Sequence, residues 1–335
     1  MKSFRCRVCD NALHFDNSVC VSCGVSLGLS QGERAIVPLD DDGAYTDLEG
    51  RVWHVCANLN LSGCTWLAEE EGGTCSCCAL TRTRPADDDE EGMAQFHEAE
   101  AAKRHLVFEL DGLGFPIVGK DPERGGDPEN GLAFDMLSSV EEDVVIGHAD
   151  GVITIDLAES DDAHREQVRS QLGEAYRTML GHLRHEVGHY MQWQLVVDGE
   201  RLERSRELFG DESKDYQAEI DRHYAEGPPE GWEDSYISFY ATMHPFEDFA
   251  ETFAHFLHIS DTIETAGEYG LTAVAPVSAF STFRDVVTGI WVPLSVALNM
   301  INRSMGKDDL YPFVIPDPVL DKLDFVASLV REGDE

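Results

Sequence analysis

The chain has 335 residues, of which 42% are apolar, so it is long enough for more than one domain with a buried core. Its 25 Lys and Arg residues against 64 Asp and Glu residues give a net charge of −39, which argues against binding to nucleic acid or to anionic membranes. It has no apolar run of about 18 residues and no apolar signal-peptide core at its N-terminus. We therefore expect a cytoplasmic, acidic protein that does not associate with a membrane.

The first feature along the chain is a pair of cysteine knuckles. Cys6 and Cys9 form one C-x-x-C unit, and Cys20 and Cys23 form another. Each knuckle presents two thiolates from a tight turn, and two knuckles complete a tetrahedral zinc site. A reducing cytoplasm favours zinc over disulfides at such cysteines. The spacing therefore predicts a structural zinc site of the zinc-ribbon type.

Five more cysteines follow before residue 79. With Cys75 and Cys78 as the knuckle, Cys56 and Cys64 complete a second four-cysteine site with looser spacing. Cys77 is then the odd thiol, although Cys77 and Cys78 could exchange roles. Such a small unit has little apolar core and needs metal to fold.

The charge of this N-terminal module indicates its role. Residues 1–85 contain seven Lys and Arg against eleven Asp and Glu, so the module has no basic patch for nucleic acid. A structural role or the docking of a protein partner is favoured. Residues 86–92 form an acidic run that reads as a linker. We therefore expect a zinc-ribbon-like module at 1–85, a linker at 86–92 and a second domain at 93–335.

The second domain opens with a predicted helix at 93–110 and two predicted strand regions at 132–137 and 144–157. Asp150-Gly151 lies between two β-branched runs and predicts a hairpin turn. Further on, helices are expected at 277–301, with a kink at Pro293, and at 317–332.

The central motif is His185-Glu186-Val187-Gly188-His189, an H-E-x-x-H pentapeptide in a helix predicted to run from Ala163 to about Val197. Positions i and i+4 share one helical face, so His185 and His189 can bind one zinc ion. Glu186 would not bind the metal, but it could take a proton from a water molecule at the metal.

A catalytic zinc needs a third protein ligand, and the stretch 244–258 offers candidates. Pro245 suits the first turn of a helix, on which Glu247 and Glu251 share one side. One carboxylate can bind zinc while the other accepts the N–H of a ligand imidazole. Glu247 is the preferred ligand, with Glu251 and His255 as alternatives. The polar stretch 200–224 could be helical and cover the site.

These residues resemble the gluzincin metallopeptidases, in which a glutamate on a later helix completes the H-E-x-x-H site. The segment from Glu247 to Glu251 looks like the E-x-x-A-E segment of the lethal-factor-like branch. By this resemblance Glu247 binds zinc and Glu251 braces a ligand histidine. Tyr240, seven residues before Glu247, would stabilise the oxyanion of the intermediate, with Tyr236 as the alternative.

The whole chain resembles the bacterial family of zinc-binding metallopeptidases that carry an N-terminal zinc-ribbon domain. The matching pieces include the cysteine knuckles, 81–85, 181–190, 244–248, 297–306 and 311–313. We therefore expect an α+β fold in which a zincin-like, mostly helical peptidase domain with a small sheet follows a double zinc-ribbon-like module. The resemblance implies one catalytic zinc and one or two structural zincs.

The expected function is zinc-dependent hydrolysis of peptide bonds, with Glu186 as general base. Its partners would be a peptide or protein substrate and possibly a protein docked on the ribbons. The alternative is a non-catalytic, zinc-stabilised adaptor. A nucleic-acid-binding ribbon protein is disfavoured by the charge.

Overall fold

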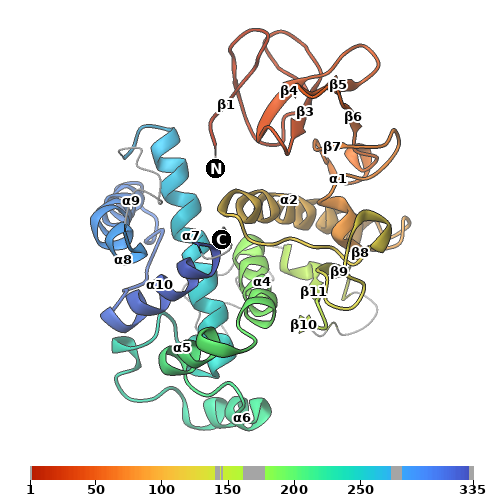
Figure 1. Ribbon diagram of the computed structural model, residues 1–335. Helices are drawn as coiled ribbons and strands as arrows, with labels where there is room; N and C mark the ends of the chain where they lie inside the picture. The colour runs from red at the N-terminus through yellow and green to blue at the C-terminus, as the bar shows by residue number, and fades with distance from the viewer. Residues whose placement is uncertain (1, 140–143, 145, 161–177, 273–280, 332–335) are drawn as a thin grey trace. The chain divides into compact units, whose positions relative to one another are not determined.

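The computed structural model describes residues 2–139, 144, 146–160, 178–272 and 281–331. The chain divides into two compact units, residues 1–112 with 116–161 and residues 113–115 with 162–335. Helices predominate and the strands form small sheets, so the expected mixed α+β class is confirmed (Figure 1).

Short antiparallel strands build the cysteine-rich part of the first unit. Two of its sheets are hairpins and the third has the order β5-β6-β7. The elements are β1 (Phe4–Arg5), β2 (Ala12–Leu13), β3 (Leu27–Ser30), β4 (Ala35–Pro38), β5 (Ala44–Thr46), β6 (Val52–Val55), α1 (Leu59–Ser62), β7 (Leu67–Ala68) and η1 (Cys78–Leu80).

The first long helix, α2 (Glu90–Leu113), begins earlier than expected. The side chain of Asp89 accepts the N–H of Gly92 at 2.8 Å, and Glu90 and Glu91 lie in the first turn. Carboxylates stabilise this end of a helix because they cap its free N–H groups and face its positive dipole. The last three residues of the predicted acidic linker are therefore helical.

The aromatic core of the first unit joins α2 to the cysteine-rich strands. The ring of Phe108 lies 5.1 Å from that of Phe15, 6.2 Å from that of Phe4 and 6.4 Å from that of Trp66, measured between centroids. All four side chains are buried. Packing of this kind makes the ribbon and α2 one body.

A four-stranded sheet with the order β10-β11-β9-β8 completes the first unit. Its strands are β8 (Thr81–Thr83), β9 (Ala133–Leu137), β10 (Gly147–Ala149) and β11 (Val152–Asp156). The predicted hairpin is confirmed, because Asp150 and Gly151 have φ of 50° and 77° and connect β10 to β11. β8 lies within the predicted ribbon module yet pairs in parallel with β9, so the compact units divide the chain differently from the predicted domains.

The second unit is organised around two helices, α4 (Met179–Leu195) and α7 (Pro245–Glu268), which lie side by side (Figure 1). The sequence predicts that the helix carrying the H-E-x-x-H motif begins near Ala163, and this predicted start is wrong. It begins at Met179, because Thr178 is extended and its side chain accepts the N–H of Gly181 at 3.0 Å, which caps the helix there. The rest of the predicted helix, 163–177, lies outside the described residues.

Two shorter helices occupy the polar stretch that follows α4. They are α5 (Gly199–Phe209) and α6 (Tyr216–Glu226), with a break at Gly210, whose φ is 100°. Short 3-10 turns complete the connections: η2 (Pro122–Arg124), η3 (Leu157–Ser160), η4 (Trp232–Asp234) and η5 (Tyr240–Thr242).

The C-terminal part contains α8 (Phe283–Val286), the π-helical turn η7 (Val287–Trp291), α9 (Val292–Ser304) and α10 (Asp317–Arg331). A kink is expected at Pro293, and the structure has the π-helical turn η7 directly before α9 there. Proline has no N–H for the preceding turn, so the regular hydrogen-bond pattern of the helix is interrupted. Within the described part of the chain, Phe283–Ser304 is the one helical stretch long and apolar enough to cross a membrane by length and composition. Core helices of soluble proteins pass the same test, so this stretch alone is weak evidence of a span.

Candidate metal centres

The histidines of the central motif come together on one face of α4. The Nε2 atoms of His185 and His189 lie 3.1 Å apart, and their ring centroids are 4.8 Å apart. The i, i+4 spacing on a continuous helix produces this geometry. Two imidazole nitrogens that face each other this closely are well suited to share a cation.

Glu247, in the first turn of α7, supplies the third donor atom. Its Oε2 lies 3.0 Å from Nε2 of His185 and 3.4 Å from Nε2 of His189. Tetrahedral zinc with bonds of about 2.1 Å places its ligand atoms about 3.4 Å apart, which is close to these separations. The donor set of two imidazoles and one carboxylate therefore fits zinc and leaves a fourth position for water.

A second layer of side chains orients the donors. Nδ1 of His185 lies 2.8 Å from Oε1 of Glu251, and the hydroxyl of Ser238 donates to Oε2 of Glu251 at 2.6 Å. Burial disfavours a charge on His185, but its hydrogen bonds to Glu247 and Glu251 outweigh burial and raise its pKa. With Nδ1–H held by Glu251, Nε2 of His185 faces the other donors.

Sequence reasoning missed two of these residues, Tyr216 and Ser238. Tyr216, the first residue of α6, donates its hydroxyl to Oε1 of Glu247 at 2.6 Å. No spacing rule connects a residue to a partner 31 positions away, so only tertiary structure could identify Tyr216. The prediction that 200–224 could be helical is confirmed by α5 and α6.

Glu186 is buried beside the donor atoms. Nε2 of His182, one turn earlier on α4, lies 3.3 Å from its Oε1. Burial raises the pKa of Glu186, but the hydrogen bond to His182 and the charges of His185 and His189 outweigh burial and lower the pKa to about 2. Its Oε2 is buried without a hydrogen-bond partner among the described residues. An oxygen without a competing partner in this position can accept a hydrogen bond from a water molecule.

The two candidate tyrosines differ in their surroundings. The ring of Tyr240 lies 5.6 Å from that of His185, edge-on, and burial together with the charge of Glu247 raises the pKa of Tyr240. Its hydroxyl therefore stays protonated and can donate a hydrogen bond. The alternative is Tyr236. The ammonium nitrogen of Lys322 lies over its ring, 4.4 Å from the ring centroid.

The structure places the alternative ligands, His255 and Glu251, outside the group of three donor atoms, and it does the same for Asp248, the neighbour of Glu247. Nδ1 of His255 lies 2.7 Å from the hydroxyl of Tyr311. Asp248 forms a buried ion pair of 2.6 Å with Lys322. Glu251 contacts Nδ1 of His185, whereas Glu247 and His189 contact Nε2 of the same ring.

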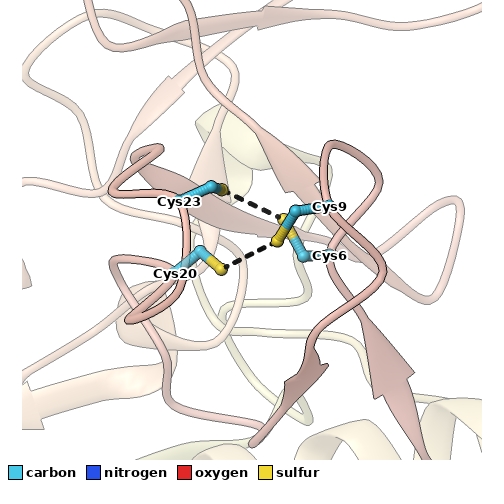
Figure 2. A group of neighbouring side chains, drawn as sticks. All are labelled: Cys6, Cys9, Cys20 and Cys23. Carbon is cyan, nitrogen blue, oxygen red and sulfur yellow. Dashed lines mark hydrogen bonds between the residues drawn. The ribbon is translucent and has the colours of Figure 1, made fainter.

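The first cysteine group is assembled by the turns after β1 and β2. Figure 2 shows its four sulfur atoms facing one another; Cys6 and Cys23 are 3.8 Å apart and Cys9 and Cys20 are 3.6 Å apart at sulfur. A disulfide would require about 2.0 Å, whereas tetrahedral zinc with Zn–S bonds of about 2.3 Å requires about 3.8 Å. These separations therefore fit zinc.

The second cysteine group contains Cys56, Cys64, Cys75 and Cys78, all buried. The sulfur atoms of Cys64 and Cys75 are 3.6 Å apart, and the N–H of Cys78 donates to the sulfur of Cys75 at 3.4 Å. Two four-cysteine groups are thus confirmed. Cys77 is also buried but does not belong to either group, and burial raises the pKa of its thiol.

Comparison with known proteins agrees with these sites. Residues 92–329 match a family described as "Putative zinc-binding metallo-peptidase", and residues 3–89 match a family described as "zinc-ribbon domain". Uncharacterized proteins of Mycobacterium bovis and Mycobacterium tuberculosis are 50% identical over 344 residues, covering 99% of this chain and 96% of theirs. No solved structure matches the chain. The chain therefore belongs to the family of zinc-binding metallopeptidases with an N-terminal zinc-ribbon domain.

Proposed function

We propose that this protein is a zinc-dependent peptidase in which His185, His189 and Glu247 hold the catalytic zinc. The observation that carries the proposal is the meeting of these three donor atoms beside the ionised Glu186. Two structural zincs would occupy the four-cysteine groups, which gives three zincs per chain.

The arrangement assigns a role to each side chain around the zinc site. A zinc ion held there would polarise a peptide carbonyl and make a water molecule more acidic. The Oε2 atom of Glu186, which has no hydrogen-bond partner among the described residues, would take a proton from the attacking water and pass it to the leaving amine, so that Glu186 serves first as general base and then as general acid. The hydroxyl of Tyr240 would donate a hydrogen bond to the carbonyl oxygen as negative charge develops on it.

Tyr216 acts on the ligand carboxylate rather than on the substrate. Because its hydroxyl holds Oε1 of Glu247, only Oε2 faces the two histidines. This contact keeps Glu247 a ligand through one oxygen and leaves room for water and substrate. His185 is fixed in the same way from its other side by Glu251.

The substrate is a peptide or protein in the cytoplasm, in keeping with the acidic composition and the reduced cysteines. None of the nine cysteines, all of which lie among the described residues, forms a disulfide. The zinc-ribbon part would dock a protein partner rather than nucleic acid, because of its net negative charge.

Incubation of the purified, zinc-loaded protein with a mixed peptide library, followed by mass spectrometry, tests the proposal. Glu186→Gln is the matched control, because it preserves shape and ligands but removes the base. Cleavage by the wild type and a loss of about 10²- to 10⁴-fold in the variant are expected. Equal cleavage by both proteins would exclude the mechanism. No cleavage by a wild type that carries three zincs would favour a zinc-stabilised adaptor.

A further inference from the structure

His182 lies one helical turn before Glu186 on α4. The N–H of His182 donates to the carbonyl of Thr178 at 2.9 Å, so the backbone of His182 belongs to the capped first turn of the helix. Positions i and i+4 are neighbours on a helix surface, which brings this imidazole next to the carboxyl group of Glu186. The helix therefore carries two such pairs, His182 with Glu186 and His185 with His189.

The contact with His182 distinguishes the two oxygens of Glu186. Nε2 of His182 lies 3.3 Å from Oε1 of Glu186, and the two side chains are 13% and 8% exposed. Oε2 of Glu186 is buried and has no hydrogen-bond partner in the part of the chain that the structure describes. One oxygen thus contacts an imidazole of the same helix, and the other is left for a water molecule.

This contact does not depend on the charge of Glu186. An ionised carboxylate accepts hydrogen bonds at both oxygens, and a carboxyl group that carries a proton on Oε2 still accepts at Oε1. When Nε2–H of His182 donates to Oε1, a proton taken from water is directed to Oε2. The same contact can therefore persist while Glu186 takes up a proton and while it gives the proton away.

The carboxyl group of Glu186 needs such a contact to be fixed in orientation. Rotation about the last torsion of a glutamate side chain has only a broad preference. Among the described residues, His182 is the one side chain within hydrogen-bonding distance of this carboxyl group. A catalytic group that is misplaced by about 1 Å can lose about 100-fold in rate. The orientation of Glu186 should therefore have a large effect on turnover.

We propose that His182 is a positioning residue that holds Glu186 at Oε1 and presents Oε2 to the attacking water. This inference rests on the proposed function, in which Glu186 moves the proton. His182 is not a member of the group of three donor atoms that would hold the catalytic zinc. Its replacement should therefore slow the reaction while the zinc content stays unchanged.

Two amide substitutions of His182 test this role with side chains of the same chemistry and different length. His182→Gln places an amide N–H near the position of Nε2, whereas the shorter side chain of His182→Asn places it near the position of Nδ1. Steady-state kinetics of the zinc-loaded, full-length proteins are measured on a peptide that the wild type cleaves. In His182→Asn, kcat should fall about 100-fold with KM unchanged, whereas His182→Gln should stay within about 10-fold of wild type.

Zinc analysis of the same samples separates the possible failures. Both variants should contain as much zinc as the wild type, and less zinc in His182→Asn would assign His182 to the metal site instead. Equal kcat values in the two variants, or a wild-type kcat in His182→Asn, would overturn the positioning role and leave the peptidase function intact. Absence of cleavage by a wild type that carries three zincs would contradict the proposed function and, with it, this role of His182.

Urea unfolding of the zinc-loaded protein measures the contact without any peptidase assay and covers the case in which His182→Asn does not fold. A double-mutant cycle combines His182→Leu with Glu186→Leu, because either change removes one partner of the hydrogen bond. The shift in the unfolding midpoint caused by His182→Leu should be smaller when Glu186 has also been replaced. Additive shifts would show that the two side chains are not coupled and would contradict the proposal.

Discussion

Gly188 lies directly against the backbone of Ala250, where α4 crosses α7. A Cβ atom on Gly188 would lie 2.9 Å from the Cα and 3.1 Å from the carbonyl oxygen of Ala250. The two helices can therefore approach closely only because position 188 has no side chain. This contact sets the separation at which Glu247 meets His185 and His189.

The Gly188→Ala variant should consequently lose both stability and zinc. Backbone atoms cannot move aside as a flexible side chain can, so the helices must separate, at a cost of about 1–3 kcal/mol in the free energy of unfolding. Urea denaturation and zinc analysis measure the two effects. Gly289→Ala is the control, because a Cβ there has no neighbour within 4 Å. Full zinc content with wild-type stability in Gly188→Ala would refute the packing argument.

Removal of the Tyr216 hydroxyl should weaken the binding of the zinc held by Glu247. Tyr216→Phe frees Oε1 of Glu247, and loss of such an outer partner costs about 10- to 100-fold in metal affinity. Competition with a zinc chelator measures this change. Tyr224→Phe is the matched control on the same helix, because Tyr224 is 65% exposed. Identical affinities in the two variants would exclude the role assigned to Tyr216.

Neighbouring cysteines should respond differently to the same substitution. Cys78→Ser removes one of four sulfur ligands and should reduce the zinc content by one ion per chain. Cys77→Ser should retain all zinc, since Cys77 is buried outside the group. Elemental analysis of the purified variants decides between them. Loss of zinc from Cys77→Ser alone would reverse the assignment.

The buried pair of Asp248 and Lys322 should be needed for the stability of the second unit. Both side chains are almost fully buried, and Lys322 also donates to the carbonyl of Ser235 at 2.9 Å. Lys322→Met leaves Asp248 without its partner and should cost about 3–5 kcal/mol. Adding Asp248→Asn should restore part of that loss in denaturant unfolding. Equal stabilities of the single and double variants would show that the pair is not coupled.

His255 should make the protein sensitive to mild acid. Burial lowers the pKa of His255 to about 4, below the value of about 6.5 expected in the unfolded chain. The unfolded state therefore binds the proton first, so the stability contributed by neutral His255 is present above pH 6.5 and decreases as the pH falls toward 4. The full loss amounts to about 3 kcal/mol. Stability measured against pH should show a shallower decline in His255→Gln, and parallel curves would contradict this assignment.

Local sequence patterns were sufficient to predict several features of the fold and of the metal sites. The C-x-x-C units, the i, i+4 histidines and the Asp150-Gly151 turn each depend on residues that are close in sequence, and short-range geometry is sufficient to relate them. The start of α4 was the exception. Apolar spacing predicts that the helix begins near Ala163, whereas the capping hydroxyl of Thr178 makes α4 begin at Met179.

The relationships between distant segments required the folded chain. Tyr216 donates a hydrogen bond to Glu247, Arg104 lines a cavity together with Gly63 and Thr65, and β8 pairs with β9, although no sequence period connects any of these. The choice of Cys78 over Cys77 likewise depends on which sulfur faces the other three. The type of each ligand and the helical face on which it lies depend on residues that are close in sequence. The side chains that hydrogen-bond to those ligands and orient them are brought together only by packing between segments that are far apart in the chain.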